Sequence, residues 1–405
     1  MTRTILFVDD EPQILEGLQH RLHGQRKRWK MLFAQSGKVA LDLLALEPVD
    51  VIVTDMRMPQ MDGASLLREV KDRYPRVVRI VLSGHAELET ALRSVPVAHQ
   101  FLNKPCEPGV LESVVERACS LQSLVNDDAV MQAVGKIEKL PSLPRVYAQL
   151  MAALTHENTS TDEVARILKQ DMAICAKTLQ VVNSAFFRLP RSIGKIEEAV
   201  RYLGLTTIKH IVLAVEVFQQ GEGCSRPPPG FSIELLQQHS LLVGEVASGF
   251  FSGKQEKEDA FVVGLLHDIG KLLLAIELPD HLQKVLIEMQ ASGCAMYIAE
   301  ERLWGVTHAE VGGYLLGLWG LPLPIIEAVA SHHVPSRVDA NQFDLLAATH
   351  ISDVMVHAEL DGQVSTKQSV ALDLAFIDRI GASDKLDTWR KQVSSHVRKR
   401  GDLKA

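Results

Sequence analysis

The sequence has few cysteines, no long apolar run and no surplus of basic residues, and each shortage removes a class of protein. Its five cysteines are scattered and form no C-x-x-C pair, which argues against a zinc ribbon, a redox motif or a disulfide scaffold and fits a reducing cytoplasm. No apolar run approaches the roughly 18 residues that cross a bilayer. The first residues turn acidic after four apolar positions, unlike a signal peptide, so we expect a cytoplasmic protein without membrane insertion.

The charge balance is mildly acidic. Lys and Arg number 43 and Asp and Glu 50, which gives a formal net charge of −7. Such a chain is a poor candidate for non-specific nucleic-acid binding. The basic residues near the C-terminus, Arg398–Arg400 among them, form a short tail that we expect to be solvated. Nucleic acid is therefore an unlikely partner.

Histidine, by contrast, is plentiful and unevenly placed. The chain has 15 histidines. Eight of them lie between positions 239 and 357, namely His239, His267, His281, His308, His332, His333, His350 and His357. A cluster of this kind is a candidate for metal binding, and its helical phase decides which members share a face.

The organisation of the chain changes after its first third. Five short apolar runs of strand length alternate there with segments of helical spacing; the runs are Ile5–Val8, Met31–Ala34, Val51–Thr54, Val77–Leu82 and Gln100–Leu102. This alternation predicts a doubly wound, five-stranded parallel sheet. From about Gly135 onward the strand signal disappears, so the fold class is α/β followed by all-α. We place the α/β domain at 1–122, a linker helix at 123–135, the helical domain at 136–375 with lobes 136–220 and 231–375, and a tail at 376–405.

An acidic pocket is expected at one edge of the sheet. Asp9 and Asp10 end the first strand and Asp55 the third, and ligands of doubly wound sheets bind at the carboxyl ends of the strands. Converging carboxylates are costly without a cation, and Mg²⁺ suits this ligand set. Ser83 and Lys104, after the fourth and fifth strands, would supply a hydroxyl and a cation for a phosphoryl group.

These residues resemble the response-regulator receiver domain. The motifs that carry the resemblance are Asp9-Asp10-Glu-Pro, Asp55-Met-Arg-Met-Pro-Gln-Met-Asp-Gly63, Leu82-Ser83-Gly84 and Phe101-Leu-Asn-Lys104-Pro105. The resemblance implies a flavodoxin-like fold, with Asp55 as the phosphoacceptor and Asp9, Asp10 and Asp55 holding magnesium. It implies that Ser83 and Lys104 contact the phosphoryl group and that Phe101 is an aromatic switch.

Several histidines of the helical region lie in phase with apolar stripes on different helices. His239 follows the stripe of 233–251, His308 and His332 are in register with two later stripes, and Asp353 shares a face with His350 and His357. One such histidine is ordinarily a core side chain. Several on different helices, with inward carboxylates, favour a metal site in the core of a helix bundle. Iron, manganese, nickel and zinc all suit imidazole and carboxylate ligands.

The order of these residues resembles the HD phosphohydrolase superfamily. The ligand set that the resemblance implies is His239, His267, Asp268, His308, His332, His333 and Asp353, with His308 and His332 at the positions that hold a second metal in binuclear members. Lys271 matches the Lys of the H-D-x-G-K signature. His350 and His357 remain alternatives to these ligands, and His281 has no assigned role.

The upstream lobe resembles the HDOD domain. The matching segments are Leu140-Pro-Ser-Leu-Pro144, Gln170-Asp171, Val182-Asn-Ser-Ala185 and Ile196–Leu205. HDOD proteins are mostly signalling modules with a degenerate metal site, whereas this sequence keeps nearly the whole ligand set. It lacks the G-Y-P motif of cyclic-di-GMP phosphodiesterases, since His332-His333 is followed by Val334-Pro335.

We therefore predict a two-component response regulator. A cognate histidine kinase phosphorylates Asp55, and the HDOD output acts through downstream signalling proteins, with a homodimer left open. The inward histidines then form a structural metal site or a hydrogen-bonded core. The alternative is a metal-dependent phosphohydrolase gated by the receiver, in which Asp268 and Lys271 are the catalytic residues.

Overall fold

The computed structural model describes most of the chain, and it contains two compact units. The described residues are 2–83, 97–104, 106, 108–122, 127–136, 144–156, 159–183, 189, 191–216, 227–361 and 371–402. The first unit contains residues up to Lys139 together with Gln180–Ser192 and Gly317–Gly320, and the second contains the remainder. Motif residues 84, 105, 140–143 and 184–185 lie outside the described ranges. None of the helices in these ranges combines the length and apolar character that a membrane crossing requires.

The first unit is built on the predicted five-stranded parallel sheet. The strands are β1 (Arg3–Val8), β2 (Trp29–Ala34), β3 (Val51–Asp55), β4 (Val78–Ser83) and β5 (Gln100–Asn103). Their order is β2-β1-β3-β4-β5 and every pair is parallel. Strands of such sheets are covered on both faces, which explains their nearly continuous apolar runs; Ile5, Leu6 and Phe7 are fully buried. The prediction of fold class is confirmed here.

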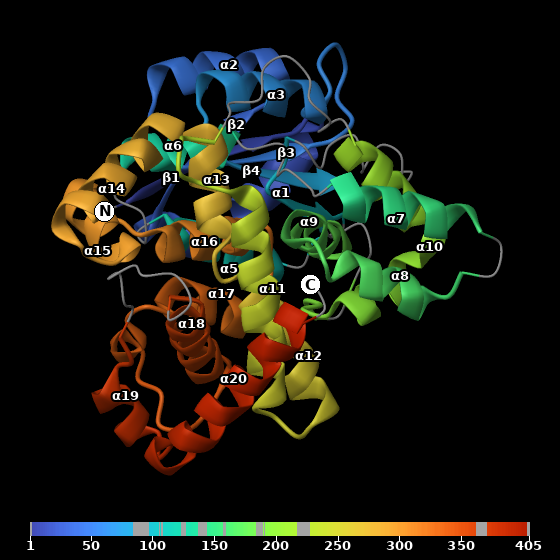
Figure 1. The fold of residues 1–405 in the computed structure, drawn as a ribbon. Coiled ribbons are helices and arrows are strands. Elements are labelled where there is room, and N and C mark those ends of the chain that lie inside the picture. The colour runs from blue at the N-terminus through green and yellow to red at the C-terminus, as the bar shows by residue number, and fades with distance from the viewer. Residues whose placement is uncertain are drawn as a thin grey trace. The chain divides into compact units, whose positions relative to one another are not determined.

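Helices cover both faces of the sheet. They are α1 (Pro12–Arg21), α2 (Gly37–Leu46), α3 (Gly63–Arg73) and α5 (Pro108–Leu121). Figure 1 shows α2 and α3 side by side over one face and α5 on the other. Two of the helices begin at side-chain caps, because Ser36 accepts a hydrogen bond from the amide of Val39 and Asp62 accepts one from the amide of Ser65.

Helix α6 (Asp128–Lys136) lies where a linker helix is predicted and packs against the sheet domain. Its apolar residues Val130 and Val134 are fully buried. The backbones approach so closely that a Cβ on Gly135 would lie 1.8 Å from the carbonyl oxygen of Pro75. The buried guanidinium of Arg79 also donates a hydrogen bond of 2.6 Å to the Gly135 carbonyl. This helix is therefore docked on the sheet domain.

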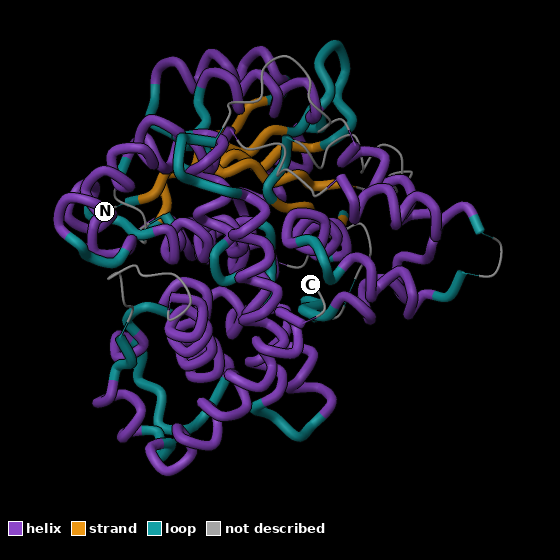
Figure 2. The backbone as a smooth tube through the Cα atoms, viewed as in Figure 1, coloured by secondary structure: helices purple, strands orange, loops and turns teal. Residues whose placement is uncertain are grey.

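The described part of the chain beyond β5 contains helices and no strand, as Figure 2 shows by colour. The upstream lobe consists of α7 (Pro144–Thr155), α8 (Thr161–Leu168), α9 (Met172–Val182) and α10 (Ile196–Glu216). The downstream lobe continues with α11 (Ile233–Gly249), α12 (Lys254–Leu266), α13 (Ile269–Glu277), α14 (Pro279–Ser292), α15 (Met296–Trp304), α16 (His308–Leu318), α17 (Leu323–Ser331) and α18 (Leu345–Asp361).

Helices α11 and α12 pack closely against each other in the downstream lobe. A Cβ on Gly264 would lie 2.6 Å from the Cα of Gly244, and a Cβ on Gly244 would lie 2.7 Å from the carbonyl oxygen of Phe261. Only glycine allows such an approach of two helix backbones. The crossing holds α11, which carries His239, in a fixed relation to α12, which His267 directly follows.

The segment 376–405, expected as a C-terminal tail, is largely helical in its described residues. The structure has α19 (Leu374–Arg379) and a long final helix α20 (Leu386–Asp402). Helix α20 packs on α18 and α11, and its side chains Trp389, Val393 and Val397 are buried. These residues recur every four positions and form one apolar face, which the charged residues between them hide in the sequence.

Candidate metal centre and phosphoacceptor pocket

The carboxyl edge of the sheet brings the predicted acidic residues together. Asp9 follows β1 and is buried, Asp55 ends β3, and Lys104 follows β5. The ammonium of Lys104 lies 2.6 Å from Oδ2 of Asp9 and also forms an ion pair with Oδ1 of Asp55. Burial opposes this charge, but the hydrogen bonds to Asp55 and Asp9 raise the pKa of Lys104 above its ordinary value. Lys104 is therefore a fixed cation between two carboxylates.

Asp10 and Ser83 lie at the same edge of the sheet, whereas Phe101 lies two residues before the end of β5. Asp10 is half-buried next to Asp9, and Phe101 is buried on β5. Ser83 ends β4 opposite Asn103 of β5, and its side chain lies outside the described ones. Backbone amides hold the carboxylates, since Asp55 Oδ2 accepts a hydrogen bond of 2.7 Å from Arg57 and Asp9 Oδ1 accepts one of 3.0 Å from Glu11.

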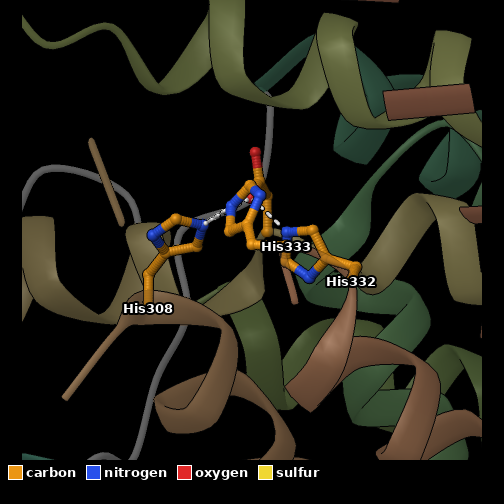
Figure 3. Close-up of side chains that lie close together, drawn as sticks. His308, His332 and His333 are labelled. Carbon is orange, nitrogen blue, oxygen red and sulfur yellow. Dashed lines mark hydrogen bonds and ion pairs between the residues drawn. The ribbon is translucent and has the colours of Figure 1, made fainter. Parts of the chain in front are cut away.

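The second site lies in the downstream helical lobe. Five segments of the chain contribute its seven predicted ligands, which lie close together. His239 is on α11, the His267–Asp268 pair joins α12 to α13, His308 begins α16, the His332–His333 pair follows α17, and Asp353 is on α18. Figure 3 shows the imidazole rings of His308, His332 and His333 pointing toward one another. Nε2 of His333 and Nε2 of His308 are 2.9 Å apart.

Two carboxylates lie at the centre of these histidines. Oδ1 of Asp268 is 3.3 Å from Nε2 of His308 and 3.8 Å from Nε2 of His332. Oδ1 of Asp353 is 3.0 Å from Nε2 of His239 and 3.5 Å from Nε2 of His267. The histidines thus surround two anionic groups in the interior of the bundle.

Five buried polar atoms of these seven residues have no hydrogen-bond partner among the residues that the structure describes. They are Nε2 of His267, Oδ1 of Asp268, Nε2 of His332, Nδ1 of His333 and Oδ2 of Asp353. Each unsatisfied buried polar group costs about 1–3 kcal/mol, and native proteins leave few of them. Because imidazole nitrogens and carboxylate oxygens are metal ligands, bound cations fit the site and would give these atoms partners.

Backbone carbonyls aim two of the rings. Nδ1 of His267 lies 2.7 Å from the carbonyl of Gly264, and Nδ1 of His332 lies 2.8 Å from the carbonyl of Val329. Since a carbonyl only accepts, each Nδ1 carries the proton, and each Nε2 has a free lone pair when the ring is neutral. Metal-ligating histidines are typically oriented in this manner.

The donor atoms form overlapping groups that share residues. One group contains Asp268, His308, His332 and His333, and others combine His239, His267 and Asp268 or His267, His332 and Asp353; within each group the donor atoms lie within 4.8 Å of one another. Asp268 belongs to two of these groups. The residues of the first two groups could therefore hold neighbouring cations that share Asp268.

Comparison with known proteins matches both halves of the chain. The family model of the response regulator receiver domain matches residues 5–116, and the model of the HDOD domain matches residues 140–335. The chain therefore contains a response regulator receiver domain followed by an HDOD domain. The predicted resemblance is thereby confirmed for both domains.

Individual relatives cover parts of this arrangement. The chain is 25% identical over 286 residues to an uncharacterized protein of Treponema pallidum, a match that covers 70% of this chain and 54% of that protein. It is 36% identical over 126 residues to the hydrogenase transcriptional regulatory protein HoxA of Cupriavidus necator, covering 31% of this chain and 26% of that protein. The chain thus spans 54% or less of the length of these curated relatives. The crystal structure of the MmoQ response regulator from Methylococcus capsulatus matches with 19% identity and a TM-score of 0.49, covering 63% of this chain and 98% of that one.

Charges inside the HDOD site are strongly coupled. Burial disfavours the ionised forms, but His267 and Lys271 hold the pKa of Asp268 well below its usual range. Despite burial, Asp268 and Asp353 raise the pKa of His267 to about 10. Burial and the neighbouring His267 lower the pKa of His332 to about 3. The ammonium of Lys271 lies 2.7 Å from Oδ2 of Asp268, so cations compensate the anionic carboxylates while His332 stays neutral.

The alternative histidines of the HDOD domain have different surroundings. His350 uses both ring nitrogens in the fold, because Nδ1 donates to the His332 carbonyl at 2.7 Å and Nε2 accepts from the Asp373 amide at 3.0 Å. His357 forms a donor group with His239 and Asp353, and its Nδ1 lies 2.9 Å from Oδ1 of Asp353. His281 packs beside Trp304, with ring centroids 5.6 Å apart, and belongs to none of the donor groups found among the described residues.

Two residues that contact the HDOD site belong to no sequence motif. Glu300 is fully buried, and its Oε2 lies 2.6 Å from Nδ1 of His308. The ring of Tyr297 is stacked on His333 with a centroid distance of 4.5 Å and an interplanar angle of 16°. Both lie on α15, which matches no part of the HD pattern. Only the folded chain brings them to the histidines.

Proposed function

We propose that this protein is a response regulator controlled by phosphorylation, whose HDOD domain carries a metal centre and acts on downstream signalling proteins. A histidine kinase phosphorylates Asp55, and the HDOD domain transmits the signal through protein contacts. The observation that supports phosphorylation of the receiver domain is the placement of Lys104 between Asp9 and Asp55. The observation that carries the metal centre is the set of five unpartnered atoms around Asp268 and Asp353 in the described part of the chain.

The receiver pocket suits a magnesium ion and a phosphoryl group. Asp9, Asp10 and Asp55 would hold Mg²⁺, which prefers carboxylates and completes its shell with water and phosphate oxygens. Lys104 already neutralises Asp9 and Asp55 and would remain beside the added phosphoryl oxygens, where a cation is favourable. Ser83 would provide a hydroxyl at the same edge.

Phosphorylation of Asp55 is tested with a phosphodonor and one conservative substitution. Acetyl phosphate with Mg²⁺ should phosphorylate the wild-type chain, measured as an intact-mass increase, and Asp55→Asn should abolish this increase. Asp62→Asn is the matched control, because Asp62 caps α3 by accepting a hydrogen bond from the Ser65 amide and an asparagine side chain keeps an acceptor oxygen. We expect the control to be labelled like the wild type. Equal labelling of the Asp55→Asn variant would overturn the assignment.

The HDOD site suits a transition metal. His239, His267, Asp268 and Asp353 would hold one ion, and His308, His332 and His333 would hold a second together with Asp268. Iron, manganese, nickel and zinc remain candidates, because mixed imidazole and carboxylate ligands suit each of them. When bound, such an ion lowers the pKa of a coordinated water and polarises phosphoryl oxygens.

Metal analysis of the full chain tests this centre. The protein is stripped with a chelator, reloaded with Mn²⁺, Fe²⁺, Ni²⁺ or Zn²⁺ in turn, desalted and measured by elemental analysis. We expect retained metal in the wild type and a large loss in Asp268→Asn, which keeps the side-chain volume but removes the charge. His281→Gln is the control, because His281 packs beside Trp304 and is not one of the proposed ligands. A wild-type chain that retains none of the four metals would overturn the proposal.

A second candidate function is a metal-dependent phosphohydrolase gated by the receiver. It is favoured by the two neighbouring groups of donor atoms that share Asp268 and by Lys271 beside them, which could neutralise a substrate phosphate. The test is a panel of phosphomonoesters, phosphodiesters and cyclic dinucleotides with metal-loaded protein. Turnover that disappears in Asp268→Ala supports the enzyme, and a loaded protein without turnover on the panel contradicts it.

A further inference from the structure

Helix α15 contributes a buried carboxylate to the site. Glu300 is fully buried, and its Oε2 accepts two hydrogen bonds from one residue, at 2.6 Å from Nδ1 and at 2.8 Å from the backbone amide of His308. The same carboxylate therefore fixes both the ring of His308 and the start of α16. These two hydrogen bonds compensate in part for the loss of water at the buried carboxylate, whose Oε1 has no hydrogen-bond partner among the described residues.

One turn earlier, the same helix contributes an aromatic ring. Tyr297 is three residues before Glu300, so both side chains lie on one face of α15. The Tyr297 ring is stacked on His333 at 4.5 Å. His333 also meets His308 edge to face, with centroids 4.8 Å apart. Both Tyr297 and His308 therefore restrict the ring of His333.

We propose that Glu300 and Tyr297 are positioning residues for the cation position formed by Asp268, His308, His332 and His333. This inference rests on the proposed metal centre. Glu300 holds the Nδ1 proton of His308, so that Nε2 is directed at Asp268, and Tyr297 fixes the plane of the His333 ring.

The other cation position takes its orienting contacts from different elements. His267 is aimed by the carbonyl of Gly264 on α12, and Asp353 is contacted by His239 and His357. Substitutions on α15 should therefore weaken one position and spare the other. Loss of an orienting partner typically lowers metal affinity by about 10–100-fold.

Stepwise metal binding distinguishes the two positions. Mn²⁺ is titrated into metal-free full-length protein and free Mn²⁺ is followed by electron paramagnetic resonance. We expect two ions in the wild type, and in Glu300→Ala one of the two ions weakened by about 10–100-fold with the other unchanged. Tyr297→Leu should act in the same direction, whereas Tyr297→Phe keeps the stacked ring and should resemble the wild type. Glu300→Ala that binds both ions like the wild type would overturn the inference.

The neighbouring carboxylate provides a matched control. Glu301 is exposed and forms an ion pair with Arg337 on the surface, so Glu301→Gln should leave both ions unchanged. Glu300→Gln keeps an oxygen that accepts from Nδ1 and should retain more affinity than Glu300→Ala. This variant also preserves side-chain volume, and it keeps the comparison valid should Glu300→Ala fail to fold.

A measurement without metal separates this inference from the proposed function. Nuclear magnetic resonance of ¹⁵N-histidine in the metal-free chain reports which ring nitrogen of His308 carries a proton. We expect an Nδ1 proton in slow exchange in the wild type and its loss in Glu300→Ala. A wild type that binds no metal but shows this difference overturns the metal centre and leaves the positioning role intact. An unchanged His308 signal overturns the positioning role whatever the metal content.

Discussion

His267 makes the proposed metal centre sensitive to pH. Its Nδ1 is held by the Gly264 carbonyl, while Asp268 and Asp353 outweigh burial and raise its pKa to about 10. The ring is therefore protonated at neutral pH in the metal-free protein. A metal requires the neutral imidazole, so binding must displace this proton.

We predict that metal affinity falls as the pH falls. Each proton released on binding changes the apparent affinity about tenfold per pH unit below the pKa of the group. Calorimetric titration with Zn²⁺ at neutral pH, in buffers of different ionisation enthalpy, should show that binding displaces a proton. Binding with no proton release would contradict the assignment of a charged His267.

The seven proposed ligands come from the resemblance to the HD pattern, and helical phase supports several of them, but their partners could not be predicted. His239 and Asp353 lie 114 residues apart and still meet at 3.0 Å, as their order in the pattern implies. Glu300 and Tyr297 have no such pattern, because their role depends on how α15 packs. His350 is the opposite case. It lies on the same helix face as Asp353, but both of its ring nitrogens form hydrogen bonds with backbone groups.

The crossing of α11 and α12 links backbone packing to the metal centre. Gly244 and Gly264 bring the two helices into contact, and Gly264 also supplies the carbonyl that aims His267. A side chain at either glycine must separate the helices. The position of His267 relative to His239 on the other helix would change with it.

We predict that Gly264→Ala destabilises the HDOD domain by about 1–3 kcal/mol, the usual cost of overpacking, and lowers metal affinity. Urea denaturation and the Mn²⁺ titration measure the two effects. Gly249→Ala is the control, because a Cβ there meets nothing within 4 Å and alanine is favoured over glycine in helices by up to about 1 kcal/mol. Equal stability of the two variants would contradict the close crossing.

Elements were predicted best where one periodicity dominates. The five strands follow from apolar runs buried on both faces, such as Ile5–Val8, and the helices of the sheet domain follow from their spacing. Helix α20 was missed because its apolar face at Trp389, Val393 and Val397 is diluted by basic and polar residues. A strongly charged helix can still be anchored by three buried side chains.

The order of the domains could be predicted from the change in pattern near Gly135, but the docking of the linker helix could not. It depends on contacts between residues far apart in sequence. Arg79 on β4 donates to the carbonyls of Val97 and Gly135, each at 2.6 Å, and Gly135 lies against Pro75. Helix α6, which follows the receiver in the chain, is therefore fixed to it.

We predict that Gly135→Ala undocks this helix without disturbing the phosphoacceptor pocket. Its Cβ would lie 1.8 Å from the Pro75 carbonyl, so α6 must shift and the hydrogen bond from Arg79 is lost. Hydrogen exchange of the full chain should become faster in a peptide covering 128–136. Gly109→Ala, whose Cβ meets nothing within 4 Å, should exchange like the wild type.

Phosphorylation by acetyl phosphate provides the second readout of the Gly135→Ala variant. Arg79 pairs with Ile52 and Leu82 pairs with Asp55, so the docking contact and Asp55 are about three residues, or roughly 10 Å, apart along the strands. Labelling of Asp55 should therefore continue in the variant while the helix exchanges faster. Loss of labelling together with faster exchange would indicate that the receiver has unfolded, and unchanged exchange would show that α6 is not held by this contact.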